Sequence, residues 1–271
     1  MKDLRSSRYG DYAMVTGASA GIGEQFTRQL AAKGMNVVMV ARRKDRLEAL
    51  ANEIAHQHGT LAEVVELDLL VDGAVDELVR RTSHLDIGVV IANAGNYAAG
   101  PFLSNDLGGE VDVLMLNARV PMELTHQFGR RFAQRGRGAI VLISSTVGAG
   151  PAPYLANYAA AKAYILSLGQ ALHYEFKKSG VDLLVVSPGP TKTEGAANAE
   201  GIDFSKLPVP MMASAKVART GLKNIGRRGH VIVGTPNKAM DFMGKHFMPR
   251  PLYNRMYGRL LYGALDADNR G

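Results

Sequence analysis

Tyr158 and Lys162 are four positions apart in an alanine-rich stretch, so on a helix both side chains project from one face. A free tyrosine, with a pKa of about 10, is a poor acid or base at neutral pH. A lysine ammonium beside the ring favours the phenolate, so we expect Lys162 to lower the pKa of Tyr158 toward the working range. The pair therefore indicates acid/base chemistry. The alternative is the ordinary surface of an amphipathic helix.

A serine hydroxyl adds a third polar group to Tyr158 and Lys162 for the same chemistry. Ser145 follows a predicted strand over residues 139–144, where its hydroxyl can bind a substrate oxygen and stabilise developing charge. Ser145 does not lie in a G-x-S-x-G elbow, which argues against a nucleophilic role for it. Its seven histidines show no HExxH-type spacing, and it contains no cysteine, so we expect no metal site.

A glycine-rich run follows the first predicted strand and opens a helix. It contains Gly17, Ser19, Gly21, Ile22 and Gly23. Glycines let the backbone turn tightly and approach a pyrophosphate, whose charge the helix N-terminus favours. The position of the run predicts dinucleotide binding, and the alternative is a tight turn without a ligand.

The end of the second strand bears on the choice of cofactor. It reads Ala41-Arg42-Arg43, without the carboxylate that would hydrogen-bond the ribose of NAD. A guanidinium binds a 2′-phosphate in a charge-assisted way, so we predict NADP(H). Arg42 is the better candidate, because Arg43 could simply begin the exposed face of the next helix.

Two further strand ends could contact the cofactor. Asp68 could accept from the adenine amino group, or could instead cap the following helix. Asn93, Ala94 and Gly95 are small enough to let the backbone lie against the cofactor.

These groups need a scaffold, and the chain alternates strands with helices. Apolar runs predict strands over 12–16, 36–41, 61–67, 87–92, 139–144, 181–187 and 231–233. Helices are predicted over 22–33, 44–58, 72–82, 111–134, 157–178 and 214–225. The alternation predicts one α/β domain over residues 1–271: a doubly wound (Rossmann) seven-stranded parallel sheet with a C-terminal helical extension at 236–271. In such a sheet the ligand binds at the carboxyl ends of the strands, where these motifs lie.

The combined pattern resembles the short-chain dehydrogenase/reductase family across residues 12–233. The matching positions are Thr16-Gly17, Gly21, Gly23, Asp68, Asn93-Ala94-Gly95, Asn117, Ser145, Tyr158, Lys162, Pro188-Gly189 and Thr193. Three positions depart from the family's usual pattern: Ala20, Ala92 and Thr191. None of the three belongs to the catalytic set.

The resemblance implies a role for each matching position. Tyr158 would exchange the hydroxyl proton, Ser145 would orient the carbonyl, and Lys162 would hold the nicotinamide ribose and tune the tyrosine. Asn117 would position a water that links Lys162 to solvent. The nicotinamide carboxamide would be fixed by the segment that contains Pro188, Gly189, Thr191 and Thr193.

The substrate is the least determined part of the function. We expect Tyr97, Tyr154, Phe204 and Met211 to line a mostly apolar pocket, which suits a hydrophobic ketone or aldehyde. The same residues could instead pack against one another. Steroid, fatty-acyl, polyketide-like and xenobiotic carbonyls all remain open.

The net charge of +7 is concentrated toward the C-terminus, where residues 216–259 contain ten Lys/Arg and one acid. A solvated basic face is the first interpretation. No motif for nucleic-acid binding accompanies it, so no nucleic-acid partner is expected, whereas an anionic substrate or lipid head group stays open.

The extension itself has an apolar stripe, formed by Leu252, Tyr253, Met256, Tyr257, Leu260 and Leu261, with Arg255 and Arg259 expected opposite. We expect it to pack against its own or a sister subunit, and the alternative is weak contact with a membrane surface. The family's usual assembly implies a homodimer or homotetramer. No signal peptide or membrane span is evident, so a cytoplasmic location is expected.

The sequence thus predicts an NADP(H)-dependent oxidoreductase that interconverts a carbonyl and an alcohol on a small-molecule substrate. Two alternatives remain. One is a catalytically silent NADP(H)-binding regulator, against which the complete set of Asn117, Ser145, Tyr158 and Lys162 argues. The other is an isomerase or lyase that uses bound NADP in a closed cycle.

Overall fold

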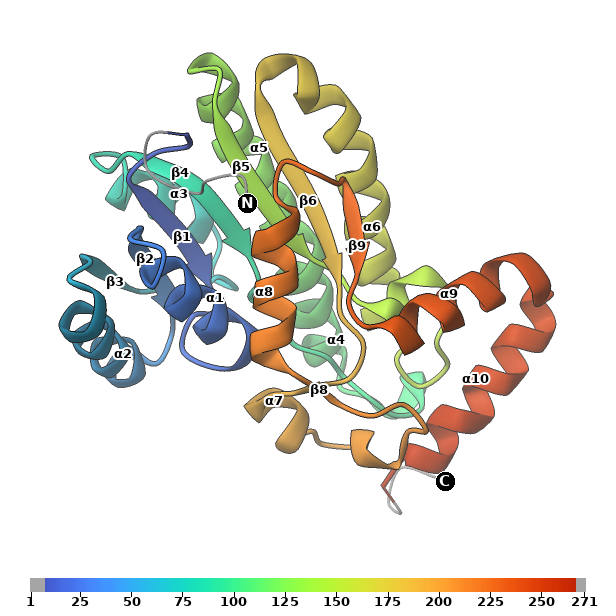
Figure 1. The fold of residues 1–271 in the computed structure, drawn as a ribbon. Helices are drawn as coiled ribbons and strands as arrows, with labels where there is room; N and C mark the ends of the chain where they lie inside the picture. The colour runs from blue at the N-terminus through green and yellow to red at the C-terminus, as the bar shows by residue number, and fades with distance from the viewer. Residues whose placement is uncertain (1–7, 267–271) are drawn as a thin grey trace.

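A parallel sheet of seven strands, in the order β3-β2-β1-β4-β5-β6-β9, forms the centre of the molecule (Figure 1). The structure is a computed structural model that describes residues 8–266. The strands are β1 (Tyr12–Thr16), β2 (Asn36–Ala41), β3 (Ala62–Glu66), β4 (Ile87–Ala92), β5 (Gly138–Ile143), β6 (Val181–Ser187) and β9 (His230–Ile232). Every residue of β4 and β5 is buried, as expected for strands covered on both faces. The predicted seven-stranded Rossmann sheet is confirmed.

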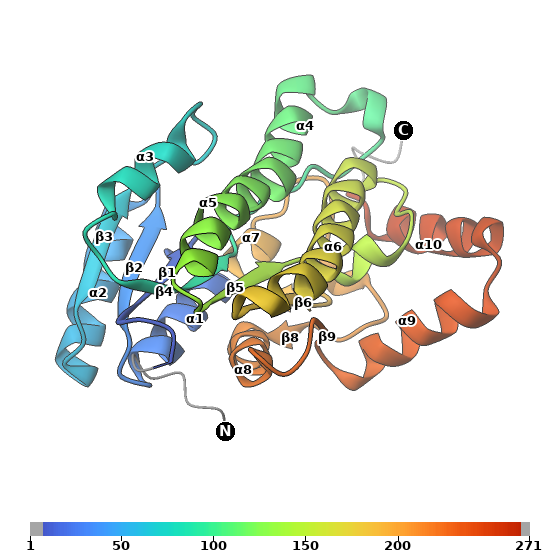
Figure 2. The same cartoon turned by 90° about the horizontal axis from the view of Figure 1, so that it is seen from above.

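Helices cover both faces of this sheet (Figure 2). One face packs against α1 (Gly21–Ala31), α2 (Lys44–His58) and α8 (Ser214–Asn224). The other packs against α3 (Ala74–Arg81), α5 (Val120–Gln134) and α6 (Ala156–Phe176). Two apolar cores result, one on each side of the sheet, and together they fix the strand ends that hold the motifs.

The long helix predicted over 111–134 consists of three pieces. They are α4 (Leu107–Leu114), a π-helical turn (Met115–Arg119) and α5. Pro121 lies in the first turn of α5. It has no N–H to donate to the carbonyl of Asn117, four residues earlier, and its ring crowds that carbonyl. The wider turn accommodates the proline and contains Asn117.

The segment after β6 has short elements that the sequence did not predict. β7 (Thr191–Lys192) and β8 (Met212–Ala213) form a small parallel pair, and α7 (Glu194–Ala197) follows β7 directly. The chain then returns through α8 to β9.

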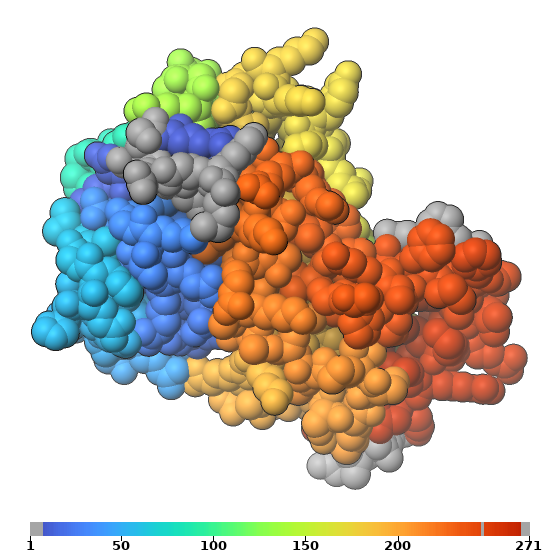
Figure 3. Space-filling model, viewed as in Figure 1, coloured from blue at the N-terminus to red at the C-terminus, as the bar shows by residue number. Residues whose placement is uncertain are grey.

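The C-terminal extension forms two helices, α9 (Thr235–Phe247) and α10 (Arg250–Ala264), which project beside the body of the molecule (Figure 3). The last five positions of the predicted extension, 267–271, lie outside the described residues. No helix within residues 8–266 is long and apolar enough to span a bilayer.

The predicted stripe on the extension is only partly correct. Leu261 is buried and Tyr257 packs beside it against the chain's own Ala152 and Leu155, which confirms packing within the subunit. Leu252 and Met256, however, are exposed. At 100° per residue these two positions share the outward side of α10 with Arg255 and Arg259, so the arginines are not opposite the whole stripe.

Candidate active site

The carboxyl ends of the strands surround a cavity of about 670 Å³. Residues from the phosphate loop after β1, the end of β2, the β4 and β5 ends and the segment after β6 all line it. All of the sequence-predicted catalytic and cofactor positions line this cavity except Gly23. The fold therefore brings the motifs together at one site.

Tyr158 and Lys162 face this cavity from the first turns of α6. The ammonium nitrogen of Lys162 lies 5.6 Å from the centroid of the Tyr158 ring. The same nitrogen donates to the Ile143 carbonyl at 2.8 Å. The hydroxyl of Ser144 donates to the Lys162 carbonyl at 2.8 Å, which joins α6 to the end of β5. Lys162 is thus held by the end of β5, and both side chains face the cavity instead of forming an ordinary helix surface.

The protonation of this pair differs from the sequence expectation. Burial raises the pKa of Tyr158 to about 12, and its hydrogen bond with Ser145 acts in the opposite direction. Burial also lowers the pKa of Lys162 to about 8. The expectation that Lys162 brings the tyrosine pKa down is therefore wrong for the chain by itself, because loss of hydration on burial is the largest influence on the tyrosine. Tyr158 keeps its proton at neutral pH and is available as an acid.

Asn117 extends the set from the π-helical turn. Its side-chain nitrogen donates to the carbonyls of Asn96 at 2.7 Å and Val113 at 2.9 Å. Its Oδ1 is buried and has no hydrogen-bond partner within residues 8–266. A Cβ added at Gly95 would lie 2.6 Å from this oxygen and 3.6 Å from the Lys162 nitrogen. An unpaired acceptor beside the lysine fits the water-holding role that the family resemblance implies. Asn96, which orients Asn117, was not singled out from the sequence, although it directly follows Gly95.

The phosphate loop is shaped by glycines that no other residue replaces easily. Gly17 and Gly21 have φ values of +67° and +60°. Gly23 lies in the first turn of α1, where a Cβ would approach the Gly17 carbonyl oxygen to 2.2 Å and the Asn93 side-chain nitrogen to 2.6 Å. Asn93 in turn donates to the Thr16 carbonyl at 2.9 Å. This backbone cradle at a helix N-terminus fits a dinucleotide pyrophosphate.

The two arginines after β2 have different surroundings. The side chain of Arg42 is 71% exposed and lies 3.8 Å from the Asp68 carboxylate. Arg43 turns back over the phosphate loop and donates to the Ser19 hydroxyl at 3.2 Å. It does not merely begin the exposed face of α2, so that alternative is wrong. Asp68 accepts from the Leu70 amide at 3.0 Å and stabilises a local turn rather than capping α3, which begins at Ala74.

The segment predicted to hold the nicotinamide is tightly packed. The Thr191 hydroxyl donates to the Gly189 carbonyl at 2.8 Å, and the Thr193 hydroxyl accepts from the Ala196 amide at 3.1 Å. A Cβ at Gly189 would lie 2.4 Å from the side-chain nitrogen of Asn237, which is buried at the start of α9. Sequence reasoning missed Asn237, since nothing in its own neighbourhood indicates this contact.

Two of the four predicted substrate residues line the cavity. The Tyr97 ring lies edge-on to Tyr158, with centroids 5.9 Å apart, and 5.4 Å from Phe204. Tyr154 and Met211 lie elsewhere: Tyr154 packs against Tyr262, and Met211 borders a second hollow beside α7. Their places are taken by Val147, Leu155, Leu207, Tyr257 and Leu261.

Comparison with known proteins agrees with this geometry. A family model described as short chain dehydrogenase matches residues 11–201. The chain belongs to the short-chain dehydrogenase family. It is 32% identical over 231 residues to a 7beta-hydroxysteroid dehydrogenase of Clostridium sardiniense, covering 85% of this chain and 88% of the relative.

Solved structures resemble the whole fold. One from a study of 7beta-hydroxysteroid dehydrogenase stereoselectivity has a TM-score of 0.85 at 29% identity, and covers 93% of this chain and 98% of its own. A short-chain dehydrogenase from Sphingobium yanoikuyae in complex with NADPH has a TM-score of 0.76 at 32% identity, with coverage of 88% and 94%. The chain is therefore an oxidoreductase that interconverts alcohols and carbonyls with a nicotinamide dinucleotide.

Proposed function

We propose that the protein reduces the carbonyl of a hydrophobic ketone or aldehyde with NADPH, with Tyr158 as the proton donor. The observation that supports this most directly is the position of Tyr158, which lines the cavity and forms a hydrogen bond with Ser145. When bound, the nicotinamide cofactor supplies the hydride. Ser145 orients the carbonyl oxygen, Tyr158 gives it a proton, and Lys162 with Asn117 replaces that proton from solvent.

The preference for NADPH over NADH rests on charge. Arg42 and Arg43 follow β2, and no carboxylate stands at the end of that strand to repel a 2′-phosphate. Arg42 is held only loosely, at 3.8 Å from Asp68. The NADPH complex of the Sphingobium relative is consistent with this choice.

The hydrophobic substrate is supported by the cavity wall that faces Tyr158. Aromatic and aliphatic side chains form it: Tyr97, Phe204, Leu207, Tyr257 and Leu261. Such a wall suits a bulky apolar carbonyl compound, and steroids, after which the hydroxysteroid dehydrogenase relatives are named, are compounds of this kind.

The test is oxidation of NADPH and NADH by the wild-type protein and by Arg42→Ala, across steroid ketones and small ketones. We expect wild-type turnover with NADPH on the bulky ketones. In Arg42→Ala, KM for NADPH should rise by roughly 10- to 100-fold, because a charge-assisted contact is lost, while KM for NADH stays unchanged. A wild-type preference for NADH would contradict the cofactor assignment. NADPH binding without turnover on any carbonyl would favour the silent regulator.

The outward side of α10 supports a second, weaker contact with anionic membranes. Leu252, Arg255, Met256 and Arg259 are all exposed there, and apolar groups mixed with cations suit a lipid head-group surface. We expect co-sedimentation with phosphatidylserine vesicles that is lost in Arg255→Glu/Arg259→Glu. Equal sedimentation of the wild type and this double variant would refute the proposed membrane contact.

We also propose a homodimer or homotetramer that assembles, as the family resemblance implies, through the helices that contain Asn117 and Tyr158. The mass of the protein in solution tests it.

A further inference from the structure

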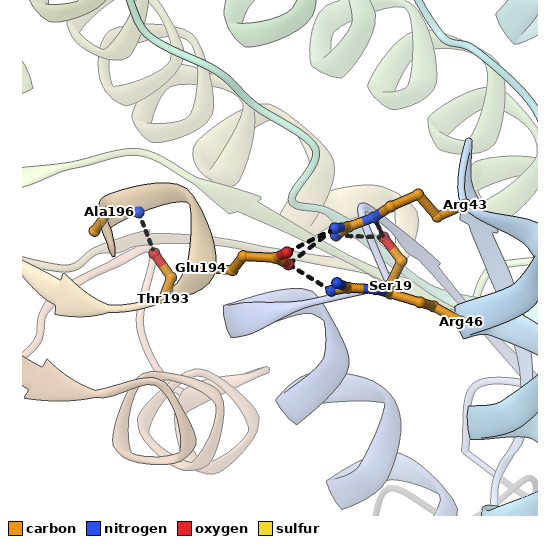
Figure 4. A network of polar contacts seen from close by, with 6 residues as sticks. All are labelled: Ser19, Arg43, Arg46, Thr193, Glu194 and Ala196. Carbon is orange, nitrogen blue, oxygen red and sulfur yellow. Dashed lines mark hydrogen bonds and ion pairs between the residues drawn. The ribbon is translucent and has the colours of Figure 1, made fainter. Parts of the chain in front are cut away.

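Glu194, the first residue of α7, joins an ionic network at the edge of the cofactor cavity (Figure 4). Its carboxylate accepts from Arg43 at 2.9 and 3.0 Å and from Arg46 at 2.6 Å. The other side of the Arg43 guanidinium donates to the Ser19 hydroxyl at 3.2 and 3.3 Å. Arg43 is therefore bonded on both sides.

The network connects opposite walls of one cavity. Ser19 belongs to the phosphate loop, Arg43 follows β2, and Glu194 comes from the segment after β6; all three line the cavity. Hydrogen bonds from Arg46 and Arg43 hold the pKa of the Glu194 carboxyl below its usual range, so the group is ionised at neutral pH. The negative charge of Glu194 therefore lies directly beside the positive charges of Arg43 and Arg46.

Carboxylates and phosphates bind a guanidinium through the same kind of paired, charge-assisted hydrogen bonds. A 2′-phosphate held by the cations after β2 therefore needs the Arg43 donors that Glu194 uses, and a phosphate beside this carboxylate is repelled. Arg42 is the less committed cation, since its side chain is largely exposed and its ion pair with Asp68 spans 3.8 Å. The Glu194 carboxylate and the 2′-phosphate would therefore both bind to Arg43.

We infer that Glu194 competes with the 2′-phosphate of NADPH for Arg43 and so limits how strongly the protein prefers NADPH to NADH. This inference rests on the proposed NADPH dependence. It makes Glu194 a determinant of cofactor specificity that reaches the site from the far side of the cavity. NADH, which lacks the 2′-phosphate, does not enter this competition.

The test is Glu194→Gln, which keeps the shape of the side chain and removes its charge. Dissociation constants for NADPH and NADH are measured through the fluorescence of the nucleotide. The chain contains no tryptophan, so tryptophan emission does not interfere. We expect NADPH to bind roughly 5- to 10-fold more tightly than to the wild type, because two partly exposed ion pairs no longer oppose it, with NADH unchanged. The gain should shrink as salt is raised.

The matched control is Glu53→Gln. Glu53 also pairs with an arginine, Arg28, but does not line the cavity, so neither constant should change. Melting temperatures of both variants establish that they are folded. If the wild type prefers NADPH and Glu194→Gln leaves that affinity unchanged, or weakens both nucleotides alike, the competition is refuted. If the wild type shows no preference for NADPH, the proposed cofactor choice fails, whereas the competition fails only if Glu194→Gln also leaves the affinity for NADPH unchanged.

Discussion

Tyr158→Phe is expected to lower the turnover number for carbonyl reduction by about 10³-fold, the effect of removing a general acid. The ring is retained, so its edge-on contact with Tyr97 and its place above Lys162 should persist. Only the hydroxyl, whose pKa burial raises to about 12, is removed from the cavity. Because the cradle after β1 is untouched, the dissociation constant for NADPH should change little. Steady-state turnover and nucleotide titration measure the two effects separately.

Tyr97→Phe provides the matched control for this variant. Tyr97 lines the same cavity and donates to the Gly195 carbonyl at 2.7 Å, but its hydroxyl is assigned no proton transfer. We expect its turnover to stay within about 10-fold of the wild type, as suits the loss of one neutral hydrogen bond. A Tyr158→Phe variant as active as Tyr97→Phe would mean that another group donates the proton.

Gly23→Ala is expected to abolish dinucleotide binding. A Cβ at this position would lie 2.2 Å from the Gly17 carbonyl oxygen and 2.6 Å from the Asn93 side chain, so the phosphate loop must move away from α1. Overpacking of this kind destabilises a protein by about 1–3 kcal/mol. A saturating ligand normally raises the melting temperature of a domain this size by roughly 5–10 °C. We expect that rise with NADPH for the wild type and none for Gly23→Ala.

Gly263→Ala is the control for the substitution itself. Gly263 lies in α10, and a Cβ there has nothing within 4 Å. Its melting temperature and its response to NADPH should match the wild type or exceed it slightly, since alanine favours the helix. A normal NADPH response in Gly23→Ala would show that the loop does not need its present shape.

Most of the scaffold could be predicted from the sequence because local patterns determine it. Continuous apolar runs gave β1, β2, β4 and β6 with their observed ends, and Gly59, with φ of +66°, ends α2 where expected. The motifs at the strand ends converge because all parallel strands end at one edge of the sheet. The interruption at Asn117 was also encoded locally, by Pro121, but was not recognised.

The remaining features depend on contacts between distant parts of the chain. Glu194 and Arg43 are 151 positions apart, and no pattern near either residue indicates their ion pair. The pKa of Tyr158 depends on burial, which outweighed the influence expected of Lys162. The substrate wall was assigned to loop residues, whereas α10 supplies Tyr257 and Leu261. Whether an extension folds back over a cavity is decided by tertiary packing, which a single sequence does not reveal.

The cavity is assembled from two stretches of the chain that divide its tasks. Residues up to Lys162 supply the phosphate cradle, the two arginines after β2 and the acid Tyr158. Apart from Tyr97, the apolar wall comes mainly from Phe204, Leu207 and α10. The later stretch is closed by its own hydrogen bonds, from Asp203 to the Ala264 carbonyl at 2.8 Å and from Asp266 to the Gly201 carbonyl at 3.2 Å. The two ends of residues 201–266 thus meet beside the cavity, whereas the middle of this stretch supplies α8 and β9 to the common core. Exchange of the wall residues alone, rather than of the whole stretch, should therefore alter the accepted ketone and leave the phosphate cradle and the acid in place.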